Sequence, residues 1–165
     1  MDDFSRVDPP YEAPEQTMLN AFLDFHRATL LWKLEGLSDE QLLRPVAPSG
    51  WCLLGLVKHL AYVERGWFRE VFAGEDLPDI GSEDDPDADW RIEPGETTEQ
   101  ILELYRSEVR LARWIAEAGR LDEEAAREGR SHTLRWIIVH MIEETARHNG
   151  HADIVRELLD GSTGE

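Results

Sequence analysis

The sequence holds a glutamate and a histidine with the spacing of two ligands to one metal ion. Glu144 and His148 lie four residues apart in the segment 133–159, and on a helix such residues lie one turn above each other and can face the same point. The apolar residues of this segment surround His148 on a helical projection, so we expect it to point inward. A carboxylate beside it is costly to bury unless it is paired or bound to a cation. An inward histidine is more often a hydrogen-bonded core residue than a ligand, so the spacing alone leaves two interpretations open, a core histidine and a divalent-metal site.

A third ligand must come from another helix. His59 borders the apolar row of the segment 50–72, which its periodicity predicts to be helical. His140 and His151 lie close enough to the apolar stripe of the last helix to be alternative ligands. Two histidines and one carboxylate would leave coordination positions open for water or a substrate.

Four segments with helical periodicity must position these side chains. They are 15–36, 50–72, 97–119 and 133–159. A short helix that begins at Ser38 and ends before Pro45 connects the first two segments. No segment shows the period-two alternation of a strand or the Asn-Gly or Asp-Gly turn of a hairpin. The pattern predicts an all-α four-helix bundle that forms one domain over residues 1–165, and such bundles can hold metal sites between facing helices.

The connection 74–96 is rich in glycine, proline and acidic residues. It carries ten of the chain's aspartates and glutamates, a composition typical of a solvated loop. We therefore expect a long, mobile acidic loop between the second and third helices of the bundle, with a lid as the alternative.

Charge and cysteine content exclude several classes of function. The formal net charge is −18, from 35 acidic and 17 basic side chains. A negative charge of this size repels nucleic acids and anionic membrane surfaces. The single cysteine, Cys52, excludes an intrachain disulfide and a multi-cysteine zinc cage. No apolar run approaches the roughly 20 residues of a membrane span. Because a secretory signal is also absent, we expect a cytoplasmic protein.

Two stretches of the sequence resemble the DinB/YfiT-like four-helix metalloprotein superfamily. They are GWCLLGLVKHLA at 50–61, followed by Trp67 and Phe68, and HMIEETARHNGHAD at 140–153. The resemblance implies an up-and-down bundle with a divalent metal held by His59, Glu144 and His148. Many members have histidine in place of Glu144. The branch with glutamate is similar to the metal-binding domain of mycothiol-dependent maleylpyruvate isomerase and related thiol S-transferases.

The resemblance implies a function for the metal site. We expect a divalent-metal-dependent S-transferase that transfers a low-molecular-weight thiol such as mycothiol to a small electrophile. Zn is our first candidate for the ion, with Ni or Fe as alternatives, and His140 or His151 is expected to move a proton or orient a ligand. A metal-dependent hydrolase and a non-catalytic metal-binding stress protein are the alternative functions. Members of the family are often homodimers, and the exposed helix faces expected here permit a homodimer.

Overall fold

The structure, a computed structural model, describes residues 4–46, 50–82 and 84–164. Within these ranges it is helical, with two isolated bridges and no β-strand. The elements are α1 (Glu15–Trp32), α2 (Asp39–Leu42), α3 (Leu53–Glu64), the π-helix η1 (Arg65–Phe72), the 3₁₀-helix η2 (Ala88–Trp90), α4 (Thr98–Ala118) and α5 (Leu134–Asp160). The predicted all-α fold is confirmed.

Local sequence signals set most of the helix ends. Ser38 and Thr97 cap α2 and α4, because the side chain of each accepts a hydrogen bond from the third backbone N–H of its helix. Helix α1 ends at Trp32, before Gly36 with its left-handed φ of 79°. The predicted helix 50–72 is divided, since α3 continues into the wider π turns of η1. Periodicity alone did not indicate this change of helix type.

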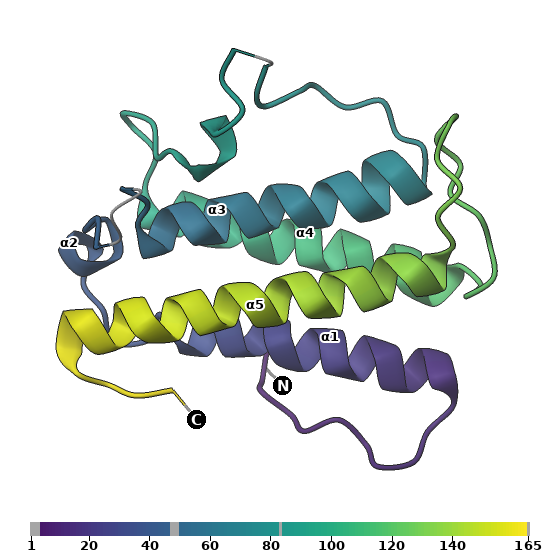
Figure 1. The fold of residues 1–165 in the computed structure, drawn as a ribbon, viewed down its shortest axis with the longest axis horizontal. Helices are drawn as coiled ribbons and strands as arrows, with labels where there is room; N and C mark the ends of the chain where they lie inside the picture. The colour runs from purple at the N-terminus through teal and green to yellow at the C-terminus, as the bar shows by residue number, and fades with distance from the viewer. Residues whose placement is uncertain (1–3, 47–49, 83, 165) are drawn as a thin grey trace.

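The four long helices form two pairs, α1 with α5 and α3 with α4 (Figure 1). Within each pair the helices run in the same direction. Near the start of α4, Glu96 binds Lys58 of α3, and further along the pair Glu108 binds Arg69 of η1. The expected up-and-down alternation therefore does not hold between α3 and α4. The reason is the connection 73–97, which runs back along the bundle before α4 begins (Figure 1).

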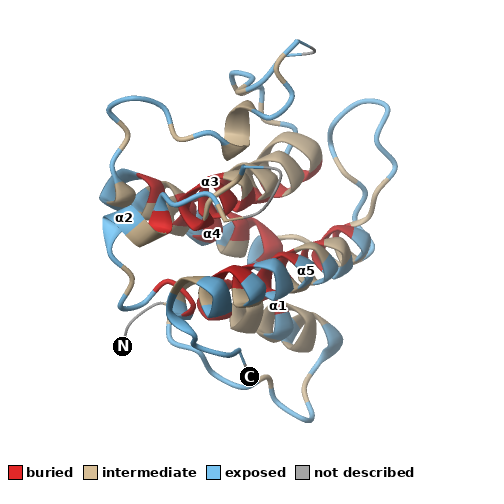
Figure 2. Ribbon diagram, turned by 60° about the vertical axis from the view of Figure 1, so that its left-hand side comes forward, coloured by how far each residue is buried: buried red, intermediate tan, exposed pale blue. Residues whose placement is uncertain are grey.

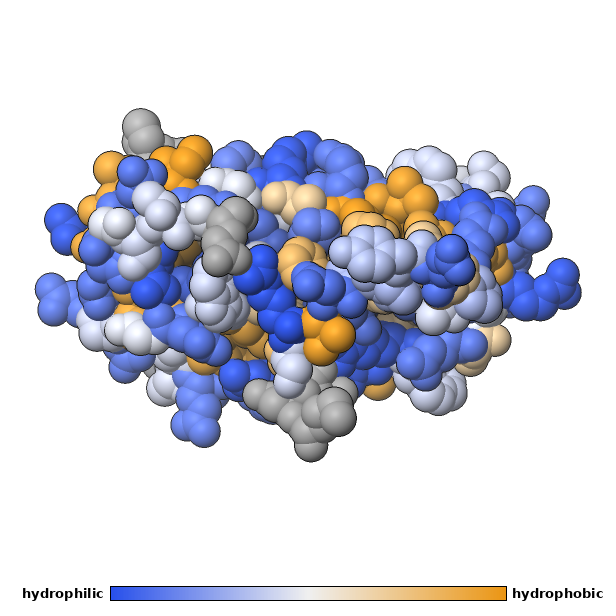
Figure 3. Space-filling model, turned by 90° about the horizontal axis from the view of Figure 1, so that it is seen from below, coloured by the Kyte–Doolittle hydropathy of each residue, from blue (hydrophilic) through white to orange (hydrophobic). Residues whose placement is uncertain are grey.

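The core lies between the two pairs. Buried residues occupy the sides of the helices that face one another, while the loops are exposed (Figure 2). Seen from the side of α1, the surface is mainly hydrophilic, with apolar residues in small separate groups (Figure 3). Within the described ranges, no helix combines the length and the apolar character that crossing a membrane requires.

A buried ion pair joins the two helix pairs. The guanidinium of Arg27 in α1 donates from Nε and Nη2 to the two carboxylate oxygens of Glu64 in α3, each at 2.6 Å. Their side chains are 2% and 1% exposed. Burial alone would lower the pKa of Arg27, but the charge and hydrogen bonds of Glu64 outweigh burial and raise it. The guanidinium of Arg27 therefore stays charged, and its Nη1 also donates to Oδ1 of Asp24 at 2.9 Å.

We expect Arg27→Met to lower the free energy of unfolding by about 3–5 kcal/mol, because it leaves the Glu64 carboxylate buried without its partner. Urea unfolding followed by circular dichroism measures the change. Arg110→Met is the matched control, since Arg110 pairs with Glu103 on the exposed surface, where such a pair contributes about 1 kcal/mol or less. Equal losses in the two variants would contradict a structural role for the buried pair.

Candidate metal centre

Three side chains from two facing helices converge between the helix pairs. His59 lies in α3, and Glu144 and His148 lie one turn apart in α5. One ligand atom of each residue, a ring nitrogen or a carboxylate oxygen, lies within 4.8 Å of the other two. The imidazole centroids of the two histidines are 5.1 Å apart. The structure thus brings together the three residues, here called the triad, that the sequence analysis selected as ligands.

Glu144 and His148 contact each other directly. Nε2 of His148 lies 3.1 Å from Oε1 of Glu144, and its buried Nδ1 has no hydrogen-bond partner among the described residues. Burial lowers the pKa of His148 from its ordinary value, against the opposing charge of Glu144. The imidazole is therefore held in the neutral form, which is the form that binds a metal. The second oxygen of Glu144 pairs with Arg147 at the surface.

The donor set of the triad fits a divalent cation of the zinc type. Two imidazoles and one carboxylate are ligands that Zn²⁺ binds, and three protein ligands leave the fourth position of a catalytic site open. Metal–ligand bonds of about 2.1 Å place two ligand atoms at most about 4.2 Å apart. Because the triad's ligand atoms already lie within 4.8 Å of one another, small side-chain rotations suffice to gather them around one ion.

His59 is held in place by two residues of η2. Its Nδ1 lies 2.7 Å from Oδ2 of Asp89, and the indole of Trp90 stacks on its ring with centroids 4.0 Å apart and planes 17° apart. Because Nδ1 is engaged with the carboxylate, Nε2 is the nitrogen left to serve as a ligand. A carboxylate in this position fixes the tautomer and orientation of a ligating histidine and raises its basicity.

The connection 74–96 is the long, largely exposed acidic loop expected from its composition, but one part of it packs against the bundle. Its η2 segment packs above α3 (Figure 1), and Lys58 anchors the chain beyond η2 through the backbone oxygen of Arg91 at 2.7 Å. A side chain at Gly55 would collide with the backbone oxygen of Trp90, 2.3 Å from the position of a Cβ. Sequence reasoning missed Asp89 and Trp90, although Trp90 stands as the one aromatic residue of this acidic segment.

The other two candidate histidines lie on either side of the triad. The exposed His151 has its ring 5.4 Å from that of His148. His140 packs against Trp67, with centroids 4.8 Å apart, and is stacked with Trp136 at 5.1 Å. Neither histidine belongs to the group of converging ligand atoms.

Cys52 serves as the N-cap of α3. Its Sγ, 3.4 Å from the backbone nitrogen of Gly55, accepts a hydrogen bond from that N–H. The side chain is neither fully buried nor fully exposed. This contact gives the sulfur a structural role at the start of the helix that carries His59.

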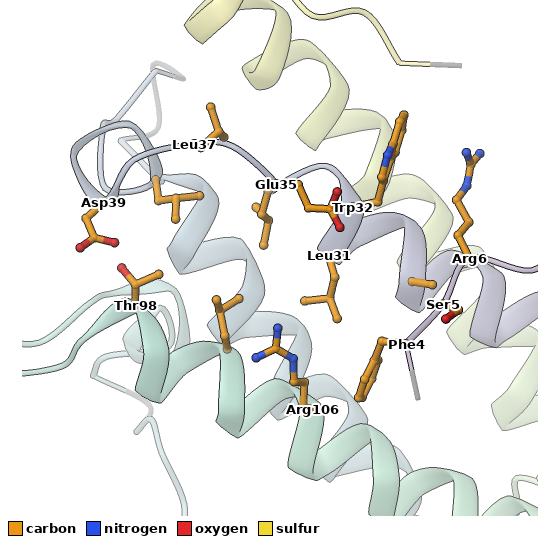
Figure 4. Close-up of a pocket in the computed structure, with 14 residues that line it drawn as sticks. Phe4, Ser5, Arg6, Leu31, Trp32, Glu35, Leu37, Asp39, Thr98 and Arg106 are labelled. Carbon is orange, nitrogen blue, oxygen red and sulfur yellow. The ribbon is translucent and has the colours of Figure 1, made fainter. Parts of the chain in front are cut away.

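A cavity of about 540 Å³ opens beside the triad. It is lined by Gly50, Trp51, Asp87, Trp90, Arg91, His148 and His151. His148 thus connects the converging ligand atoms with a space large enough for a small molecule. Another cavity, of about 470 Å³, lies between α1, α2 and α4, with Glu35 and Arg106 among its lining residues (Figure 4). No residue of the triad lines that second cavity.

Comparison with known proteins gives one family. The family model described as mycothiol-S-transferase (MST) matches residues 18–161. The match extends from α1 through α5 and includes the whole triad and the η2 segment. No protein with curated annotation matches the chain.

We expect His59→Ala, Glu144→Ala and His148→Ala each to weaken divalent-metal binding by more than about 100-fold, since changing a residue that merely supports a ligand already costs about 10–100-fold. Elemental analysis of protein purified without a histidine tag, followed by equilibrium dialysis, measures occupancy and affinity. His140→Ala is the matched control, because this histidine lies on α5 outside the triad. Full metal occupancy in all three triad variants would refute the ligand assignment.

We expect Asp89→Asn to lower the metal affinity by about 10–100-fold while leaving the fold intact, because the amide cannot supply the negative charge that raises the basicity of His59. Competition with a chromophoric zinc chelator measures the affinity. Asp76→Asn is a suitable control, since Asp76 is an exposed acid of the same connection. An unchanged affinity in Asp89→Asn would show that the contact with His59 does not support metal binding.

Proposed function

The chain belongs to the mycothiol S-transferase family, and from this premise we propose that it is a divalent-metal-dependent transferase. It would join the sulfur of a low-molecular-weight thiol of the mycothiol type to a small electrophile. The observation that carries the proposal is the convergence of the triad at the wall of a cavity. We propose Zn as the ion, with Ni or Fe as the alternatives that elemental analysis would distinguish.

His59, Glu144 and His148 would hold the divalent cation, which would lower the pKa of a thiol and so supply a thiolate at neutral pH. The protein itself then needs no nucleophile. Cys52 has no role in the proposed reaction because its Sγ caps α3. In the transfer, the sulfur forms a bond to the electrophilic carbon, the bond from that carbon to the leaving group breaks, and the leaving group takes the electron pair.

The proton of the thiol needs an acceptor near the cavity. We assign this role to a ring nitrogen of His151, because His151 lines the cavity and its ring lies 5.4 Å from that of His148. His140, which the sequence analysis considered for the same role, packs instead against Trp67 and Trp136. An exposed imidazole can pass the proton on to water.

We expect the metal-loaded protein to accelerate the conjugation of mycothiol to monochlorobimane, and the chelator-treated protein to lose this activity. The fluorescence of the conjugate measures the rate. His148→Ala should be inactive because it cannot hold the ion. His151→Gln should retain the metal and lose about 100-fold or more in kcat, the usual contribution of a positioned proton acceptor.

Controls separate this function from its alternatives. His140→Gln should keep both the metal and the rate, since His140 does not line the cavity. Failure to accelerate conjugation of mycothiol, bacillithiol, coenzyme A or glutathione would refute the proposal. Turnover of esters or amides without any added thiol would identify a hydrolase, and metal-induced thermal stabilisation without turnover would identify a non-catalytic protein.

A further inference from the structure

The second cavity, between α1, α2 and α4, lies away from the triad and is here called the distal cavity. Its volume is about 470 Å³ (Figure 4), which is in the range of sites that bind small molecules. No residue of the triad lines it, and the proposed transfer reaction uses none of its lining residues. A ligand of the distal cavity would therefore be a different molecule from the substrates at the triad.

Leucine side chains give the distal cavity an apolar wall. Leu34 of α1 and Leu42 of α2 are buried in the core, and Leu31 and Leu102 are partly buried. Leu31 extends from α1 into the space between α1 and α4 (Figure 4). Covering such aliphatic surface with the apolar part of a ligand removes it from water, which favours binding. The wall therefore suits a ligand with an apolar body.

Arg106 brings an unpaired positive charge to this apolar wall. Its guanidinium extends from α4 into the space between α4 and α1 (Figure 4). Among the described residues, none forms a hydrogen bond or an ion pair with its side chain. The other described arginines without a side-chain partner, Arg44, Arg120 and Arg130, are exposed, whereas Arg106 is partly buried. A partly buried cation without a counter-charge favours an anionic ligand, and a guanidinium matches a carboxylate with two parallel hydrogen bonds.

Two acidic residues at the rim of the distal cavity call for the opposite charge. Glu35 and Asp39 are exposed, and neither carboxylate has a hydrogen bond or an ion pair within the described ranges. The remaining charged residue of the lining, Arg6, already donates to the hydroxyl of Thr29 at 3.2 Å. A carboxylate ligand without an amine would meet the repulsion of the two acids, and an amine without a carboxylate would meet that of Arg106. A ligand that carries both charges satisfies both sides of the cavity.

We propose that the distal cavity binds a small zwitterion with an apolar body, the chemical class of the apolar α-amino acids. The carboxylate of the ligand binds the guanidinium of Arg106, and its ammonium group binds Glu35 or Asp39 at the rim. The apolar side chain of the ligand packs on Leu31 and Leu102. This site is independent of the proposed transferase function, because the distal cavity shares no residue with the triad or with the cavity beside it.

Three related probes test the proposal in calorimetric titrations of the metal-loaded protein. L-phenylalanine carries both charges, 3-phenylpropanoate lacks the ammonium group, and 2-phenylethylamine lacks the carboxylate. We expect phenylalanine to bind most tightly, because each of the other probes leaves one charge of the cavity unmatched. Arg106→Gln should weaken the binding of phenylalanine about tenfold or more, the size of a hydrogen-bonded charge contact. Arg110→Gln is the matched control, since Arg110 lies one turn further along α4, pairs with Glu103 at the surface and does not line the cavity.

A variant of the rim tests the recognition of the ammonium group. We expect Glu35→Gln to weaken the binding of phenylalanine about two- to fivefold, the size of an exposed ion pair, and to strengthen the binding of 3-phenylpropanoate, because one repelling charge is removed. Glu40→Gln is the control, since Glu40 is an exposed acid of α2 that does not line the cavity. Glu35 is exposed and its carboxylate has no partner among the described residues, so the variant should fold normally.

An amino acid can also chelate a metal ion through its amine and carboxylate, so the same titration is made with His148→Ala, which is expected to lack the ion. Binding of phenylalanine that persists in His148→Ala and weakens in Arg106→Gln supports the proposal. Binding that is lost in His148→Ala and unchanged in Arg106→Gln places the amino acid at the triad and overturns it. No binding of phenylalanine, or equal binding of the three probes, also overturns it, whether or not the protein conjugates thiols.

Discussion

The positions of the helices depend on how the two helix pairs are held against each other. The ion pair of Arg27 and Glu64 crosses the boundary between them with two bonds of 2.6 Å in the core. Since removing one charge would leave the other buried in a medium of low polarity, sliding of α1 along α3 is strongly disfavoured. Helix α1 also packs along α5, so fixing α1 against α3 also fixes α5 against α3. The separation of His59 from Glu144 and His148 is thereby set by a contact outside the triad.

The direction of the helices determines what covers the triad. Because α3 and α4 run in the same direction, the chain must return along the bundle between them, and a short turn cannot do this (Figure 1). The returning segment passes over α3 and places Asp89 and Trp90 on His59. It also supplies Asp87 and Arg91 to the cavity. The same connection thus both orients a ligand and forms part of the wall of the cavity.

The sequence predicted those features that depend on local geometry. The spacing of Glu144 and His148 follows from the helical repeat alone, and the apolar row beside His59 indicated which side of its helix faces inward. The roles of Asp89 and Trp90 could not be predicted in this way, because they depend on the path of a loop through space. Acidic composition indicated solvent exposure on average and carried no information on which of ten acids would turn inward. The direction of α4 was missed for the same reason.

The triad and the cavity walls come from different kinds of structure. The triad lies on two long helices whose packing is set by the core, whereas Trp51 and Asp87 belong to the segments that precede α3 and η2. Substitutions at these wall positions would alter the lining of the cavity without altering the backbone that holds the triad. Trp90 is the exception, because its ring both stacks on His59 and lines the cavity. A ligand packed against Trp90 therefore also presses on the ring of a proposed metal ligand, which couples the occupancy of the cavity to the orientation of His59.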